Sequence, residues 1–140
     1  TFAQAPSGQA TMQALREKLQ ADKKLVVAAN MDLSAEEAQA FWPIYEEYQK
    51  ELQKVNERLA TAIVSYASSF KAKSLSDEQA MALSKQAMAI EDDESLLRMA
   101  MAQRLGTVLP GRKVARYMQI ESKVRAIVKY EIAAEVPLVP

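Results

Sequence analysis

The feature that most constrains the fold is a stripe of apolar residues between positions 41 and 70. At 100° per residue these positions fall within an arc of about 100°, which is one face of an α-helix. The stripe consists of Phe41, Ile44, Tyr45, Tyr48, Leu52, Val55, Leu59, Ala62, Ile63, Tyr66 and Phe70, and Glu46, Lys50, Gln53 and Glu57 lie opposite. The pattern predicts one helix of about 37 residues, about 55 Å long, with one buried face.

Two short motifs frame this helix. Ser34 can accept a hydrogen bond from the backbone of Glu37, and the Glu37 side chain can reach back to the backbone of Ser34. Ser76 and Gln79 repeat the same capping arrangement further along the chain. Each motif therefore predicts the start of a helix.

The whole chain is expected to be all-α, because it has only 3 glycines and is rich in residues that lose little side-chain freedom in a helix. We expect four long amphipathic helices in antiparallel hairpins, over about 9–30, 34–70, 77–108 and 112–134. The expected domain organisation is a tail over 1–9, a single helical domain over 10–134 and an extended tail over 135–140.

Proline residues mark two irregular points. Pro43 cannot donate to the carbonyl of Gln39 and disfavours helical geometry at Trp42, so we expect a kink, or a break and restart, near Pro43. Pro110, followed by Gly111, predicts a turn that opens the last helix.

The composition argues against several functions. The 18 basic and 18 acidic residues balance, so no overall field attracts nucleic acid. The chain has no cysteine and no histidine, which removes thiolate and imidazole chemistry and ordinary zinc or copper sites. No apolar run reaches the ~20 residues of a membrane span. We therefore expect no enzyme activity, no cofactor, no metal and no membrane-spanning segment.

Charged residues in the second half predict contacts between helices. The acidic run 91–94 could bind a cation such as calcium, but consecutive helical positions point about 100° apart, which favours a solvated face. If the last two helices form a hairpin about Pro110, Glu94 lies level with Arg125 and Glu121 lies near Arg98. We expect these as structural ion pairs, because a buried carboxylate needs a partner. The alternative is a catalytic carboxylate pair, which no nucleophile or base accompanies.

Seven methionines offer two interpretations. Thioether side chains fill cores, and they can also form an adaptable surface for varied apolar partners. Met81, Met88 and Met99 lie off the main apolar stripe of their predicted helix and are the candidates for a surface. A site for cuprous ion is the third alternative, without histidine or cysteine to support it.

The start of the sequence, Thr1-Phe2-Ala3-Gln4-Ala5-Pro6, is similar to the small-residue end of a secretory signal. This pattern predicts secretion through a removed signal peptide. The alternative is an alanine-rich disordered tail, and the breaker residues Pro6-Ser7-Gly8 fit both interpretations.

The two capping motifs, Leu33-Ser34-Ala35-Glu36-Glu37 and Leu75-Ser76-Asp77-Glu78-Gln79, resemble the paired Leu-Thr-x-x-Gln repeats of the Spy/CpxP family of small periplasmic proteins. The first motif ends in Glu instead of Gln, and both have Ser for Thr. The resemblance covers about 31–108 and implies a four-helix, often dimeric cradle that serves as an ATP-independent chaperone or an envelope-stress regulator. This chain lacks the histidines of metal-sensing relatives and the net positive charge of chaperone members.

The resulting hypothesis is a periplasmic, homodimeric, chaperone-like protein that holds apolar segments of unfolded or partly folded envelope proteins. Its candidate contact residues are Phe41, Trp42, Tyr45, Met81, Met88 and Met99. The alternative is a regulatory or stress-sensing subunit that docks on the periplasmic domain of a membrane sensor through basic residues of the last helix. Those residues are Arg112, Arg116, Lys123, Arg125 and Lys129.

Overall fold

The computed structural model describes the backbone of residues 8–140, and the side chains of 17, 18 and 20–140. The described chain consists of four helices: α1 (Gly8–Met31), α2 (Ala35–Lys71), α3 (Asp77–Leu105) and α4 (Gly111–Glu135). This confirms the predicted all-α fold. The predicted signal end at 1–6 lies outside the described residues.

The described chain divides into two compact units, with the division between Ser34 and Ala35. The single helical domain expected over 10–134 stays a prediction. In the first unit, α1 buries Val27 and Met31. Val26 and Ala29 of the same helix are exposed.

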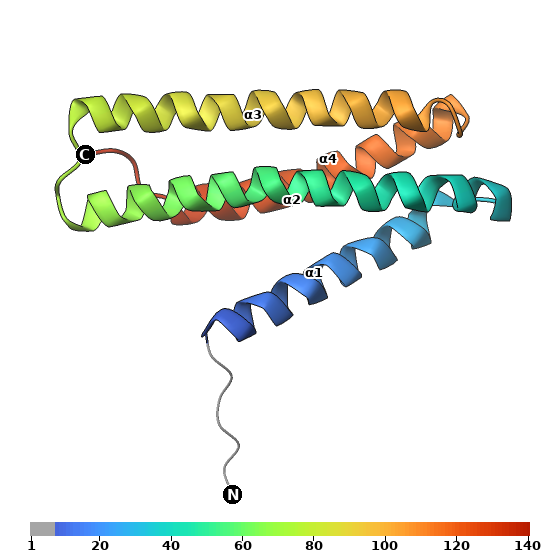
Figure 1. Cartoon of the computed structure of the whole chain (residues 1–140), viewed down its shortest axis with the longest axis horizontal. Helices are drawn as coiled ribbons and strands as arrows, with labels where there is room; N and C mark the ends of the chain where they lie inside the picture. The colour runs from blue at the N-terminus through green and yellow to red at the C-terminus, as the bar shows by residue number, and fades with distance from the viewer. Residues whose placement is uncertain (1–7) are drawn as a thin grey trace, which may run out of the picture. The chain divides into compact units, whose positions relative to one another are not determined.

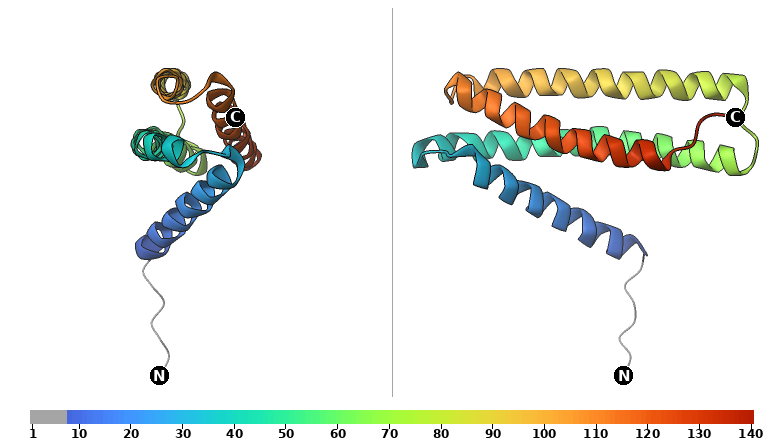
Figure 2. Two further views of the ribbon diagram at one scale, coloured as in Figure 1. Left: turned by 90° about the vertical axis from the view of Figure 1, so that its right-hand side faces the viewer. Right: turned by 180° about the vertical axis from the view of Figure 1, so that it is seen from behind.

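In the second unit, α2 and α3 run antiparallel, and α4 runs antiparallel to α3 alongside both of them (Figures 1 and 2). The reversal between α2 and α3 uses Lys73, whose φ of 52° lies in the left-handed region. The backbone N–H of Ser74 donates to the carbonyl of Ser69 across this turn, as helix C-termini commonly do. The predicted hairpins of α2 with α3 and α3 with α4 are therefore present.

The predicted start of α3 is present in detail. The Ser76 hydroxyl accepts from the backbone of Gln79 at 3.1 Å, and the Gln79 side chain accepts from the backbone of Ser76 at 3.0 Å. Ser34 lies directly before the first residue of α2, which is the N-cap position. In α2, Glu37 has an additional partner that the sequence did not predict, because Lys113 of α4 donates to its carboxylate at 2.5 Å.

Pro43 does not divide α2. The helix continues from Ala35 to Lys71 with Pro43 inside it, so the predicted break and restart is wrong, while the predicted kink stays a prediction. Pro43 is exposed, and the hydrogen bond that it cannot make to Gln39 is lost on the solvent side, where water can satisfy a carbonyl. The apolar face of α2 is thus uninterrupted.

An aromatic cluster of five rings forms one end of the core: Phe41, Trp42, Tyr45 and Tyr48 of α2 and Tyr117 of α4. The centroid of Tyr117 lies 5.3 Å from that of Phe41 and 6.1 Å from that of Tyr45, with the rings nearly perpendicular. Such edge-to-face pairs add to the stabilisation from burial. Met101 and Leu105 of α3 lie at the same end, as the Arg104–Glu47 pair shows, and further along the bundle the core contains Val55, Ala62 and Ile90.

Candidate protein-binding surface

The outer face of α3 carries a row of three methionines, which we call the methionine stripe: Met81, Met88 and Met99. The intervals of 7 and 11 residues bring these positions back to within about 20° of one another on a helix. Their exposed fractions are 59%, 56% and 58%. The expectation that they lie off the buried face of α3 is confirmed.

α3 is apolar on two sides. Its inner face buries Ile90, Met101 and Leu105 against the other helices, while the methionine stripe lies on the outer face. Leu96, which is 64% exposed, lies about 60° from the stripe and extends it. Leu96 was not predicted from the sequence, although its position three residues before Met99 places it near that methionine on a helix. Large apolar side chains are thus exposed along several turns of one helix face, and an apolar face gathered on one element is what marks an interaction site.

An open depression lies at the beginning of the stripe. Asp77, Glu78, Met81, Ala82 and Lys85 line it, so it combines apolar side chains with charged ones. All five belong to the first turns of α3. The depression is a local hollow of the helix surface and has no enclosed volume that would suit a small-molecule substrate.

The aromatic candidates for partner binding are mostly inaccessible. Phe41 is 0% and Tyr45 2% exposed, because both pack against Tyr117. This corrects the expectation that these two rings contact a partner. Trp42 is partly exposed and packs edge-on against Phe41 and Tyr45. The apolar stripe of α2 thus builds the core, and only Trp42 of the three reaches the surface.

The buried tyrosines have strongly perturbed acidity. Burial raises the pKa of the Tyr117 hydroxyl, and the neighbouring Glu121 carboxylate raises it further. The pKa values of Tyr45 and Tyr48 are raised by the same two causes in the same order. These hydroxyls remain protonated donors in the folded protein at any ordinary pH.

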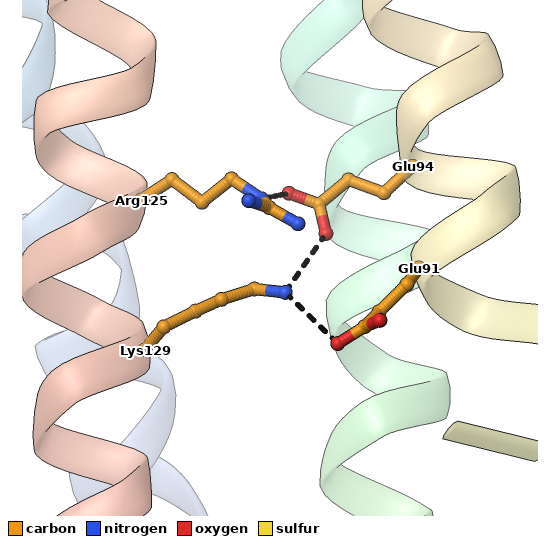
Figure 3. A network of polar contacts seen from close by, with 4 residues as sticks. All are labelled: Glu91, Glu94, Arg125 and Lys129. Atoms are coloured by element: carbon orange, nitrogen blue, oxygen red, sulfur yellow. Dashed lines mark hydrogen bonds and ion pairs between the residues drawn. The ribbon is translucent and has the colours of Figure 1, made fainter. Parts of the chain in front are cut away.

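The predicted ion pair between α3 and α4 is present. Arg125 donates through Nε to Oε1 of Glu94, a carboxylate that is only 8% exposed. Figure 3 shows Lys129 beside the same acid, with its Nζ 4.0 Å from Oε2 of Glu94 and 3.5 Å from Oε1 of Glu91. The pairs fix the register of α3 against α4.

The second predicted pair is replaced by other contacts. Glu121 is 4% exposed and accepts hydrogen bonds from the Tyr117 hydroxyl at 2.6 Å and from Nε2 of Gln49 at 3.3 Å. The ion pairs of the described side chains do not include the predicted one between Glu121 and Arg98. The physical reason is that the carboxylate is already satisfied by Tyr117 of its own helix and by Gln49 of α2.

The basic candidates on α4 divide into two groups. Arg112, Arg116 and Lys123 are exposed. Arg125 and Lys129 are half-buried and are engaged with acids of α3. Arg125 and Lys129 therefore form structural ion pairs and are no longer candidates for the docking surface.

The described residues contain no group of three or more carboxylates placed to hold a metal ion. No described helix is both long and apolar enough to cross a membrane. The surfaces that remain as candidates are the methionine stripe with Leu96 and the exposed basic residues Arg112, Arg116 and Lys123 of α4.

Comparison of the chain with protein-family models, with curated proteins and with solved structures finds no match. The resemblance to the Spy/CpxP family is therefore an expectation from the two capping motifs alone.

Proposed function

We propose that this protein is a chaperone-like binding protein, periplasmic and ATP-independent, that holds apolar segments of unfolded or partly folded envelope proteins. The observation that carries the proposal is the exposure of Met81, Met88, Leu96 and Met99 on the outer face of one helix. An apolar face of this kind on a folded chain is typical of an interaction surface.

Methionine suits this task better than other apolar residues. Its unbranched thioether side chain adapts to partners of different shape at little cost, so one surface can accept many sequences. A rigid aromatic surface would select one partner instead. The burial of Phe41 and Tyr45 removes such a surface from the candidates.

The proposal is tested by the aggregation of a reduced model protein, for example reduced insulin, followed by light scattering. The protein at an equimolar ratio should suppress the scattering. A variant with Met81→Gln, Met88→Gln and Met99→Gln should lose most of the suppression, because it removes the apolar stripe while it keeps side-chain length. Absence of suppression by the unaltered protein would contradict the proposal.

A matched control replaces three exposed apolar residues outside α3: Val64→Gln, Ile127→Gln and Tyr130→Gln. This variant should suppress aggregation as the unaltered protein does. Equal loss in both variants would mean that general surface hydrophobicity, and not the stripe, holds the client. Recovery of one stoichiometric partner from an envelope fraction would favour the alternative, a regulator that docks on a membrane sensor.

A further inference from the structure

The carboxylates of α3 divide according to the face on which they lie. Glu91, Asp93 and Glu94 contact Lys129, Arg58 and Arg125, respectively, so they pair with cations of the neighbouring helices. Asp77, Glu78 and Asp92 are exposed, and the described side chains provide them with no ion pair. The acids that stabilise the fold are thus separate from those on the outer face.

The exposed acids accompany the methionine stripe. Asp92 lies between Met88 and Met99 in the sequence and falls within about 20° of the stripe on the helix. Asp77 and Glu78 line the depression beside Met81, together with Lys85, the one cation of that depression. The outer face of α3 is therefore both apolar and acidic.

Helix stability explains only part of this arrangement. Asp77 and Glu78 lie in the first turn of α3, where negative charge interacts favourably with the helix N-terminus. Asp92 lies in the middle of the helix, beyond the reach of that effect, which falls off within one turn. No contact among the described residues gives Asp92 a structural role at this position.

We propose that the methionine stripe binds a cationic amphipathic helix of a partner protein, an inference that rests on the proposed function and specifies the client. Apolar side chains of the partner contact Met81, Met88 and Met99, and its Lys or Arg side chains lie beside Asp77, Glu78 and Asp92. The stripe spans positions 81–99, or about 27 Å, which corresponds to about 18 residues of a helical partner.

A helix fits this surface better than an extended strand does. Strand addition needs a free sheet edge, and the described residues contain no strand. A single row of apolar side chains along a helix matches the i, i+3, i+4, i+7 spacing of an amphipathic helical ligand. Charge complementarity then decides between ligands of equal apolar content.

The test uses two labelled peptides of 18 residues with identical leucine positions, one with lysine and one with glutamate at the polar positions. Binding is measured by fluorescence anisotropy. The lysine peptide should bind at least ten-fold more tightly than the glutamate peptide, and high salt should reduce this preference several-fold. Equal affinity for the two peptides would overturn the inference.

Variants locate the effect. Asp77→Asn, Glu78→Gln and Asp92→Asn together should weaken binding of the lysine peptide several-fold and leave the glutamate peptide unaffected or bound more tightly. The matched control Glu36→Gln, Glu131→Gln and Glu135→Gln removes the same charge from exposed positions elsewhere and should have little effect. An equal loss in both variants would overturn the assignment to α3.

The remaining outcomes separate this inference from the proposed function. If neither peptide binds while reduced insulin is still kept from aggregating, the cationic helix is excluded and the general holding function stands. If both assays fail, both proposals fail. A solution mass of two chains that the triple methionine variant returns to one would show that a second copy covers the stripe, and this too would overturn the inference.

Discussion

The two halves of α4 are attached to the bundle by different chemistry. In the first half, Tyr117 is fully buried among rings of α2. After Glu121, no residue of this fully described helix is buried. The second half is attached by the ion pairs of Arg125 and Lys129 with α3, and the Tyr66 hydroxyl donates to the Pro137 carbonyl just beyond the helix at 2.8 Å.

The two attachments differ in how strongly they depend on ionic strength. Burial of aromatic rings hardly depends on salt, whereas ion pairs at a partly exposed position weaken as ionic strength rises. Local opening of a folded protein begins where few apolar side chains are buried. We therefore expect the second half of α4 to open first, with the first half opening only when the whole bundle unfolds.

The largest expected effect comes from Tyr117→Ala. Removal of this ring leaves a cavity among the aromatic side chains and should lower the free energy of unfolding by about 3–5 kcal/mol, measured by urea denaturation. Tyr130→Ala in the same helix is the matched control, since Tyr130 is exposed, and it should change stability by less than about 0.5 kcal/mol. Similar losses in both variants would refute the comparison between the halves.

Alkaline pH should lower the free energy of unfolding through the buried tyrosines of the aromatic cluster. Because burial raises the pKa values of Tyr45, Tyr48 and Tyr117 in the folded protein, the stabilisation is complete below the unfolded pKa of about 10 and declines as pH rises above it. At pH 10.5 the three tyrosines together should reduce stability by about 2.5 kcal/mol.

Urea denaturation at pH 8 and pH 10.5 measures this alkaline loss. Lysine side chains also lose charge in this range, so a control is required. Tyr48→Phe should remove about a third of the alkaline loss if the tyrosines cause it. An unchanged loss in this variant would assign the effect to the lysines.

Glu94→Gln should weaken the second half of α4. The substitution removes the charge that Arg125 and Lys129 share, and we expect a loss of about 1–2 kcal/mol in low salt that becomes smaller in 1 M salt. Asp93→Asn is the neighbouring control: its pair with Arg58 is exposed, so it should cost about 0.5 kcal/mol. A loss that does not depend on salt would mean that packing, and not charge, holds this half.

Lys129→Gln is expected to have the smallest effect, about 0.3–0.5 kcal/mol, because both of its ion pairs are long. Amide hydrogen exchange should nevertheless become faster for the last turns of α4 and remain unchanged near Tyr117. Lys123→Gln, at an exposed position without a described ion pair, should leave the exchange rates unaltered.

Periodicity predicted α2 well because its buried face repeats at helical spacing over many turns, from Phe41 to Ala62. The capping pair Ser76 and Gln79 was predictable for a similar reason, since all of its atoms lie within one turn. The pair of Glu94 and Arg125 followed from assuming a hairpin about Pro110. These features depend on local spacing or on one simple fold topology.

Other features depend on how helices that are distant in sequence pack against one another. A stripe of apolar residues on α2 does not reveal whether Phe41 and Tyr45 meet a partner or the chain itself, and Tyr117 from α4 decides this. The donors of Glu121 include Gln49, which is distant in sequence and belongs to α2, outside the hairpin of α3 and α4. The continuity of α2 through Pro43 likewise depends on which side of the helix faces water.

The ion pair at Glu94 has a consequence for the orientation of α3 about its own axis. Because α3 has apolar side chains on two sides, burial alone gives little preference for turning one side or the other inward. A half turn about the axis would bring Asp92 inward without a described partner and separate Glu94 from Arg125. The carboxylate thus selects a single rotational setting, and this setting keeps the methionines outside.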